Sequence, residues 1–138
     1  MDIFQKVKSL NLPSGEYIVF GSGPLQAHGI RETRDVDILV LSELYEKLKQ
    51  EGWEERVWET SPPGRFLFKD DVEVGDSWDY GEYNPDPNWL IENAEIINGV
   101  PFAPLEEVLK GKKAFGRPKD LEDIKLIEEY LETTKKEK

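Results

Sequence analysis

The sequence predicts an α+β fold in which strands and helices form α/β-type layers, and two observations lead to this prediction. Short apolar runs bounded by Gly, Pro or Ser, such as residues 16–20 and 35–40, are typical of buried strands. Segments with apolar residues three or four positions apart, such as residues 1–10, are typical of helices that bury one face. A length of 138 residues is ordinary for one domain, so residues 1–138 are expected to form one.

The first half of the chain predicts helices and strands separated by turns. A short helix is expected to begin at Pro24, with Ser22 or Gly23 as its cap, and to stop at Gly29. The elements expected in this half are a helix over residues 1–10, a strand over 16–20, a helix over 24–28, a strand over 35–40 and a helix over 43–51.

The second half predicts a hairpin and a helical C-terminal segment, about residues 104–131. Its expected elements are a strand over 54–59, a turn at 62–64, hairpin strands over 65–68 and 71–74, a short strand over 95–98, a helix over 104–110 and a last helix from 118 to about 131. Residues 75–89 are expected to be irregular and residues 132–138 to fray.

The irregular stretch carries four aromatic residues, Trp78, Tyr80, Tyr83 and Trp89. Such rings could stack on a base or form the wall of an acceptor pocket. Packing against the sheet is the commoner fate of aromatic side chains, and it is the interpretation favoured here for most of them.

Two aspartates in the predicted strand over residues 35–40 are the strongest functional signal. Alternate residues of a strand face the same side, so Asp35 and Asp37 project together while Val36 and Ile38 face the core. Charged residues on a surface strand are the ordinary alternative. However, two carboxylates inside an apolar run repel each other unless a cation lies between them. A divalent ion that carries a nucleoside triphosphate would suit this place.

The turn before the short helix reads Gly21-Ser22-Gly23 and follows an apolar strand. Free backbone N–H groups at the start of the helix, together with the Ser22 hydroxyl, could face a phosphate. An ordinary strand-to-helix turn explains the same residues. The turn matches neither the phosphate-binding loop that ends in Gly-Lys-Ser/Thr nor the dinucleotide-binding glycine fingerprint.

Together these motifs resemble those of the nucleotidyltransferase superfamily, which includes DNA polymerase β and the aminoglycoside and lincosamide nucleotidyltransferases. The superfamily pattern matches Phe20-Gly21-Ser22 followed by Asp35-Val36-Asp37-Ile38. A narrower branch with the AbiEii-like toxins matches His28-Gly29, Arg31 and Thr33, and also the segment from Lys112 to Asp123, KKAFGRPKDLED. The resemblance covers roughly residues 15–130. It implies the nucleotidyltransferase fold, a mixed, twisted β-sheet flanked by helices.

The resemblance also implies a third carboxylate on a strand beside the aspartates. The apolar-acid-apolar run Val72-Glu73-Val74 makes Glu73 the first candidate, although most relatives carry Asp there. Asp76 is the second candidate. An exposed position on an edge strand is the alternative for Glu73. The catalytic and metal-binding residues implied by the resemblance are therefore Asp35, Asp37 and Glu73.

The activity implied is transfer of a nucleoside monophosphate from a nucleoside triphosphate, with ATP as the expected donor, to a small molecule or a protein side chain. The residues expected to bind the nucleotide are Gly21, Ser22, Gly23, Arg31, Thr33, Lys112 and Lys119. Five basic residues lie between positions 110 and 119, and charge alone leaves them as either a solvated surface or a phosphate clamp. The resemblance favours the clamp for Lys112 and Lys119.

Composition limits the cofactor and the partners. The chain has no cysteine and one histidine, so carboxylates have to hold any metal, which favours Mg²⁺ or Mn²⁺. His28 is expected to be structural. The net charge of −11 disfavours nucleic acid as a partner. No signal peptide or membrane-length apolar run is present, which predicts no membrane partner and a cytoplasmic location.

The short chain leaves little mass for an acceptor-binding domain. A partner protein or a homodimer would then supply the missing wall. The competing hypothesis is a non-catalytic nucleotide-binding protein, or an antitoxin-like regulatory protein, that keeps the fold.

Overall fold

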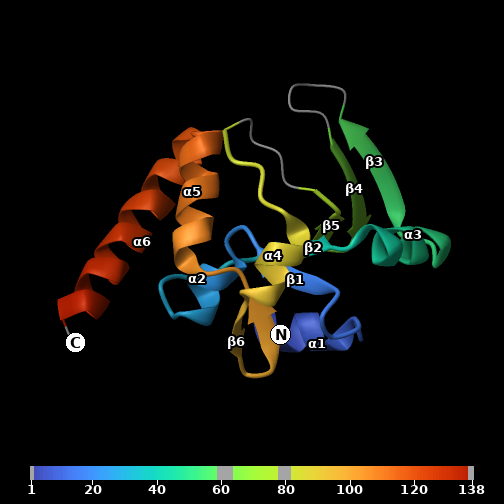
Figure 1. Ribbon diagram of the computed structural model, residues 1–138, viewed down its shortest axis with the longest axis horizontal. Coiled ribbons are helices and arrows are strands. Elements are labelled where there is room, and N and C mark those ends of the chain that lie inside the picture. The colour runs from blue at the N-terminus through green and yellow to red at the C-terminus, as the bar shows by residue number, and fades with distance from the viewer. Residues whose placement is uncertain (1, 59–63, 78–81, 137–138) are drawn as a thin grey trace.

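The computed structural model describes residues 2–58, 64–77 and 82–136, which form helices around one mixed seven-stranded sheet (Figure 1). The order of strands in the sheet is β3-β4-β5-β2-β1-β7-β6. The strands are β1 Tyr17–Phe20, β2 Val36–Val40, β3 Glu54–Trp58, β4 Gly64–Lys69, β5 Val72–Gly75, β6 Glu95–Ile97 and β7 Val100–Phe102. The helices are α1 Ile3–Ser9, α2 Gly23–Ala27, α3 Ser42–Gln50, α4 Pro87–Glu92, α5 Leu105–Phe115 and α6 Pro118–Lys136.

Strand β2 lies at the centre of the sheet and determines where the acidic residues stand. It pairs antiparallel with β1 and parallel with β5. The register places Asp37 beside Phe20 on one side and beside Glu73 on the other. Because paired residues of neighbouring strands face the same side of a sheet, Asp37 and Glu73 project together.

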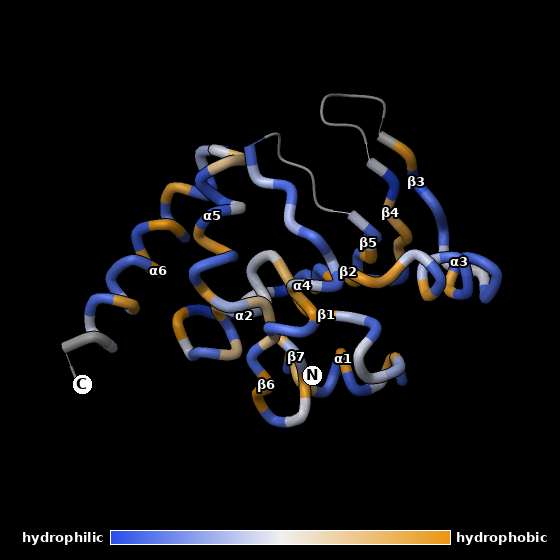
Figure 2. Tube along the Cα trace, viewed as in Figure 1, coloured by the Kyte–Doolittle hydropathy of each residue, from blue (hydrophilic) through white to orange (hydrophobic). Residues whose placement is uncertain are grey.

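Each face of the sheet is covered by its own apolar layer. Helices α1 and α3 cover one face with buried side chains that include Val7 and Leu48. Helices α4, α5 and α6 cover the other face with Leu90, Val108 and Ile127. Figure 2 shows apolar residues along the central strands, whereas α6 alternates between apolar and hydrophilic residues, as expected for a helix with one buried side.

The predicted helices and strands of the first half, and the hairpin, are confirmed to within one or two residues. The irregular segment expected over 75–89 is wrong at its end, because α4 begins at Pro87. The Asp86 carboxylate caps this helix by accepting a hydrogen bond from the Asn88 backbone N–H at 2.9 Å. Strand β7, which was not predicted, follows β6 after a turn at Asn98 and Gly99, both of which have positive φ.

The C-terminal helices are both longer than predicted. Helix α5 continues beyond Lys110 to Phe115 and ends where Gly116 adopts a left-handed conformation, with φ of +64°. The fraying expected for residues 132–138 is wrong for residues 132–136, which continue α6. Within this last part of α6, the Thr133 and Thr134 hydroxyls donate hydrogen bonds to the carbonyls four residues earlier, at 3.0 and 2.9 Å.

Three expectations lie outside the described residues: the turn at Pro62 and Pro63, the packing of Trp78 and Tyr80, and the fraying of residues 137 and 138. Within the described ranges, none of the helices has both the length and the apolar character needed to span a membrane.

Candidate functional site

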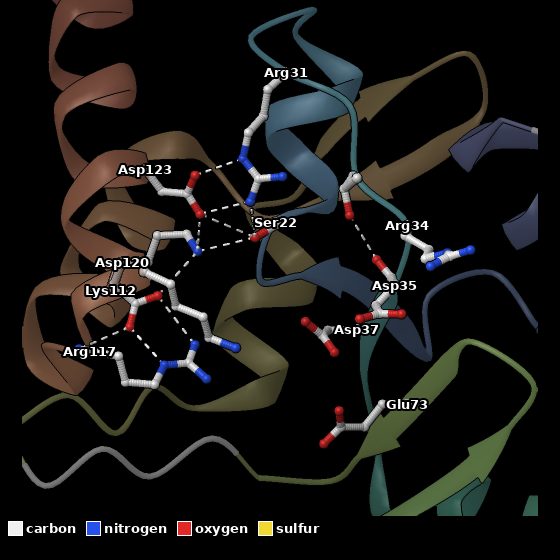
Figure 3. A pocket seen from close by; sticks show the side chains of 12 residues that line it. Ser22, Arg31, Arg34, Asp35, Asp37, Glu73, Lys112, Arg117, Asp120 and Asp123 are labelled. Carbon is white, nitrogen blue, oxygen red and sulfur yellow. Dashed lines mark hydrogen bonds and ion pairs between the residues drawn. The ribbon is translucent and has the colours of Figure 1, made fainter.

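A pocket of about 300 Å³ opens between the sheet and the paired helices α5 and α6 (Figure 3). Its acidic wall consists of Asp35, Asp37 and Glu73. Asp35 immediately precedes β2 and is exposed, whereas Asp37 in β2 and Glu73 in β5 are partly buried. The structure thus brings the three carboxylates predicted from the sequence to one side of one pocket.

The turn after β1 allows the Asp37 carboxylate to lie close to the backbone. Gly21 has φ of +64°, a conformation that side chains disfavour. A Cβ atom at this position would overlap with Oδ2 of Asp37 and would lie 3.1 Å from its Cβ and Cγ atoms. Glycine is therefore required here for two reasons, backbone conformation and space.

The cations near the acidic wall do not fully offset the repulsion among its carboxylates and the cost of burying them. Burial raises the pKa of Asp37 to about 6, the charge of Asp35 adds to this rise, and Lys112 and Arg117 offset only part of it. Burial, followed by the charge of Asp37, raises the pKa of Glu73 to about 7. A cation bound between these carboxylates would relieve both the repulsion and the loss of hydration.

The donor set of this wall is oxygen alone, which suits a hard ion such as Mg²⁺ or Mn²⁺. In the part of the chain that the structure describes, no three His, Cys, Asp or Glu side chains are close enough together to form a ready metal-binding group. A metal ion held by all three carboxylates would therefore draw them closer than they lie here.

The opposite wall of the pocket is basic and comes from the C-terminal helices. Lys112 of α5 is 9% exposed, and its Nζ lies 3.0 Å from Asp123 Oδ2 and 3.6 Å from Asp120 Oδ1. Arg117 lies between the two helices and binds both oxygens of Asp120, at 2.8 and 3.2 Å. Lys119, in the first turn of α6, is exposed and lines the pocket.

Asp123 is the centre of a hydrogen-bonded network that joins this wall to the β1–α2 turn (Figure 3). Arg31 donates to both of its oxygens, from Nε at 2.7 Å and from Nη2 at 2.8 Å. The Ser22 hydroxyl accepts from Arg31 at 3.0 Å and from Lys112 at 3.2 Å. Burial alone would raise the pKa of Asp123, but the hydrogen bonds from Arg31 and Lys112 outweigh it and hold the pKa at about 2.

Of the residues expected to bind a nucleotide, five line the pocket: Ser22, Arg31, Thr33, Lys112 and Lys119. Gly21 lines a smaller hollow next to it, which also borders Asp37. Gly23 is absent from both linings. It is buried, and a Cβ there would lie 2.5 Å from Val19 Cγ1, so its small size serves packing. The Thr33 hydroxyl donates to the carbonyl of Asp35 at 2.9 Å, which fixes the loop before β2.

Asp76, the second candidate for the third carboxylate, lies outside the pocket. It accepts hydrogen bonds from Arg65 at 2.6 Å and from Ser42 at 3.1 Å. Its charge is therefore neutralised next to α3, and Glu73 is the acid that stands beside Asp37.

Sequence reasoning missed Asp120 and Asp123, and it placed Arg117 only in a general basic cluster. The two acids are 1% and 5% exposed, although both follow a Gly-Arg-Pro-Lys run that looks like a surface turn. Their spacing of three residues puts them on one face of α6. That spacing was the available signal, but the partner Arg31 is 92 positions away.

Of the remaining predicted side chains, His28 and Tyr83 have structural contacts and Trp89 does not pack as expected. The His28 ring lies 3.3 Å from the Tyr130 hydroxyl and 3.1 Å from Glu95 Oε2, as expected for a structural histidine. Tyr83 stacks on Phe20, in agreement with packing. Trp89 is 47% exposed, so packing is wrong for this residue.

Comparison with known proteins identifies the fold. No family model matches the chain, and no curated protein matches it in sequence. Among solved structures, the chain is similar to that of the aminoglycoside nucleotidyltransferase ANT(2")-Ia in complex with adenylyl-2"-tobramycin. The two are 21% identical with a TM-score of 0.53, over 97% of this chain and 88% of that chain. The chain therefore has a nucleotidyltransferase-like fold.

Proposed function

We propose that this protein transfers a nucleoside monophosphate from a nucleoside triphosphate, with ATP as the first candidate, to the hydroxyl group of a small molecule or protein. The observation that carries the proposal is the pocket itself. Three carboxylates line one side of a pocket of about 300 Å³, and cations of α5 and α6 line the opposite side. The fold around this pocket is similar to that of a nucleotidyltransferase.

Asp35, Asp37 and Glu73 would hold Mg²⁺ or Mn²⁺, because their oxygen donors and their unrelieved repulsion suit a divalent ion. When bound, such an ion neutralises phosphate charge and polarises the phosphoryl oxygens. The basic wall would attract the triphosphate and stabilise the charge that develops on pyrophosphate as it leaves.

The reaction would proceed by attack of the acceptor oxygen on the α-phosphorus. The bond between the α-phosphorus and the oxygen that bridges to the β-phosphate breaks, and pyrophosphate leaves with its electron pair. Glu73 would either complete the ligand set or accept the proton of the attacking hydroxyl. A partner protein or a second copy of the chain would complete the acceptor site.

A second candidate function is nucleotide binding without transfer, as in a regulatory or antitoxin-like protein. The three carboxylates are too far apart here to form a ready metal-binding group among the described residues, and this spacing favours the second candidate because transfer needs a more exact ligand geometry than binding of a magnesium–nucleotide complex does. The narrower resemblance to the AbiEii-like branch also remains a prediction.

Labelled transfer distinguishes the two candidates. ATP, GTP, CTP and UTP, each labelled at the α-phosphate, would be incubated with the protein, Mg²⁺ or Mn²⁺, and acceptors that include an aminoglycoside and a protein fraction. Asp37→Asn removes a carboxylate of the pocket. Asp70→Asn is the matched control, since Asp70 is exposed in the β4–β5 turn and its φ of +55° is one that asparagine adopts readily.

Transfer of label by the parent and by Asp70→Asn, but not by Asp37→Asn, is the expected result. If ATP raises the Tm of the protein only with Mg²⁺ present, and no label reaches any acceptor, the second candidate, nucleotide binding without transfer, is favoured. The same ATP affinity in the parent and in Asp37→Asn, with and without Mg²⁺, would overturn the metal site. No binding of any of the four triphosphates in Mg²⁺ or Mn²⁺ would overturn both candidates.

A further inference from the structure

The basic wall of the pocket contains two kinds of cation, which differ in how many of their N–H donors the protein already uses. An arginine has five N–H donors and a lysine three, so the donors left over can be counted from the contacts. Donors without a protein acceptor in a pocket are the ones available to a ligand.

Almost all the N–H donors of Arg31 and Lys112 already face partners within the protein. Arg31 donates four hydrogen bonds, two to Asp123, one to the Ser22 hydroxyl and one to the carbonyl of Glu32. Lys112 Nζ donates to Ser22 Oγ at 3.2 Å and forms ion pairs with Asp123 at 3.0 Å and with Asp120 at 3.6 Å, so its charge is already paired within the protein. These two cations hold the helices α5 and α6 against the β1–α2 turn.

Arg117 is different, because one edge of its guanidinium faces the protein and the rest faces the pocket. Nε and Nη2 bind the buried Asp120, whereas Nη1 has no acceptor among the described residues. The guanidinium also lies over the ring of Phe115, 3.9 Å from its centroid, and this contact fixes its plane. The side chain is 43% exposed and lines the pocket.

Lys119 also has its donors available, since it forms no ion pair or hydrogen bond with the described residues and lines the pocket. Arg34 lines the pocket as well, and its side chain likewise forms no ion pair or hydrogen bond with the described residues, but it directly precedes Asp35 and lies on the acidic side of the pocket, away from the basic wall (Figure 3).

We infer that Arg117, together with Lys119, binds the phosphates of the donor nucleotide directly, and that Arg31 and Lys112 act as the frame that positions them. The inference rests on the proposed function and names the residues that contact its substrate. Asp120 orients Arg117 for this role, because it binds one edge of the guanidinium and leaves the other edge facing the pocket. A guanidinium so fixed can offer two parallel N–H groups to a phosphate.

Matched substitutions test the inference. Arg117→Gln removes one positive charge from the pocket and breaks a bidentate pair with Asp120. Arg65→Gln is the matched control, because it removes one positive charge and breaks the bidentate pair with Asp76, which lies outside the pocket. ATP affinity would be measured by calorimetry with Mg²⁺, at a temperature where melting curves show each variant to be folded. Arg117→Lys, which keeps the charge but not the planar guanidinium, replaces Arg117→Gln if the latter does not fold.

We expect Arg117→Gln to weaken ATP binding about tenfold or more, the effect of losing charge-assisted hydrogen bonds, and Arg65→Gln to leave it unchanged to within about threefold. Inorganic tripolyphosphate, used as a competitor, should lose the same factor as ATP in Arg117→Gln. A loss for ATP alone would mean that Arg117 contacts the base or ribose, and would overturn the assignment to phosphate.

Parent-like affinity in Arg117→Gln, or an equal loss in both variants, would overturn the inference while the proposed function stands. A parent protein that binds no nucleotide triphosphate in Mg²⁺ or Mn²⁺ would overturn the proposed function, and this inference with it.

Discussion

Replacing Gly21 by alanine tests whether the Asp37 carboxylate has to lie against the turn after β1. The alanine Cβ would overlap with Oδ2 of Asp37 and would lie 3.1 Å from its Cβ and Cγ atoms. Ordinary contacts between carbon atoms are about 3.5–4.0 Å, so the Asp37 side chain has to move or rotate. Its carboxylate then no longer faces the pocket as it does beside glycine.

Gly29→Ala is the matched control for the backbone. Gly29 has φ of +72° against +64° for Gly21, but a Cβ at Gly29 would have no atom within 4 Å. Both alanines have to adopt a left-handed conformation, which costs about 1–2 kcal/mol. Forcing the Asp37 side chain out of its rotamer adds about 0.5–1.5 kcal/mol in Gly21→Ala alone. The expected losses are about 1.5–3.5 kcal/mol for Gly21→Ala and about 1–2 kcal/mol for Gly29→Ala.

Two measurements separate these effects. Urea unfolding gives the free energies, and thermal melting with ATP and Mg²⁺ gives the stabilisation by ligand, which requires binding to the native state. We expect Gly29→Ala to keep the ligand-induced rise in Tm and Gly21→Ala to lose it. An equal rise in both variants would show that Asp37 does not need its place against the turn, and the geometry proposed for the acidic wall would then be wrong.

Three further predictions concern single side chains of the pocket. Asp37→Asn should melt at the same or a higher temperature than the parent in EDTA, because it relieves repulsion in the acidic wall; a much lower Tm would instead make Asp37 a structural hydrogen-bond acceptor. Lys119→Ala should weaken ATP binding measured by calorimetry, whereas Lys125→Ala, an exposed lysine of the same helix, should not; matching effects would return Lys119 to the solvated surface. The Asp123 carboxyl has its pKa held at about 2, below its unfolded value, so it contributes about 2 kcal/mol of stability that is present above about pH 4 and is lost as the pH falls toward 2. The difference in unfolding free energy between the parent and Asp123→Asn should therefore shrink between pH 5 and pH 2.5, and a constant difference would contradict the network around Asp123.

Local patterns were enough to predict the central part of the fold. The apolar strands, the glycine turns and the alternation around Asp35 and Asp37 depend on residues close together in the chain, and the structure has these elements nearly as expected. The missed helix α4 was also local, since Asp86-Pro87 is a good helix start that the many polar residues around it obscured.

The walls of the pocket could be predicted only in part. The spacing of Asp35 and Asp37 predicts that they face the same side, and the resemblance to the nucleotidyltransferases predicts Glu73 on the neighbouring strand, where it pairs with Asp37. The contacts of Arg31 could not be predicted in this way, because its partner Asp123 belongs to a helix far along the chain. A single sequence gives the type and charge of each residue, but it does not state which distant carboxylate accepts from which cation.

The same distance along the chain has a consequence for how the protein folds. The hydrogen bonds that join Ser22 and Arg31 to the C-terminal helices close loops of 90 to 101 residues. Pairing of β2 with β5 joins segments much nearer to each other, so loop-closure entropy allows it earlier. We therefore expect the carboxylates to come together before the cations arrive opposite them. Docking of α5 and α6 would then complete the pocket late in folding, and local opening of these two helices would expose the acids first.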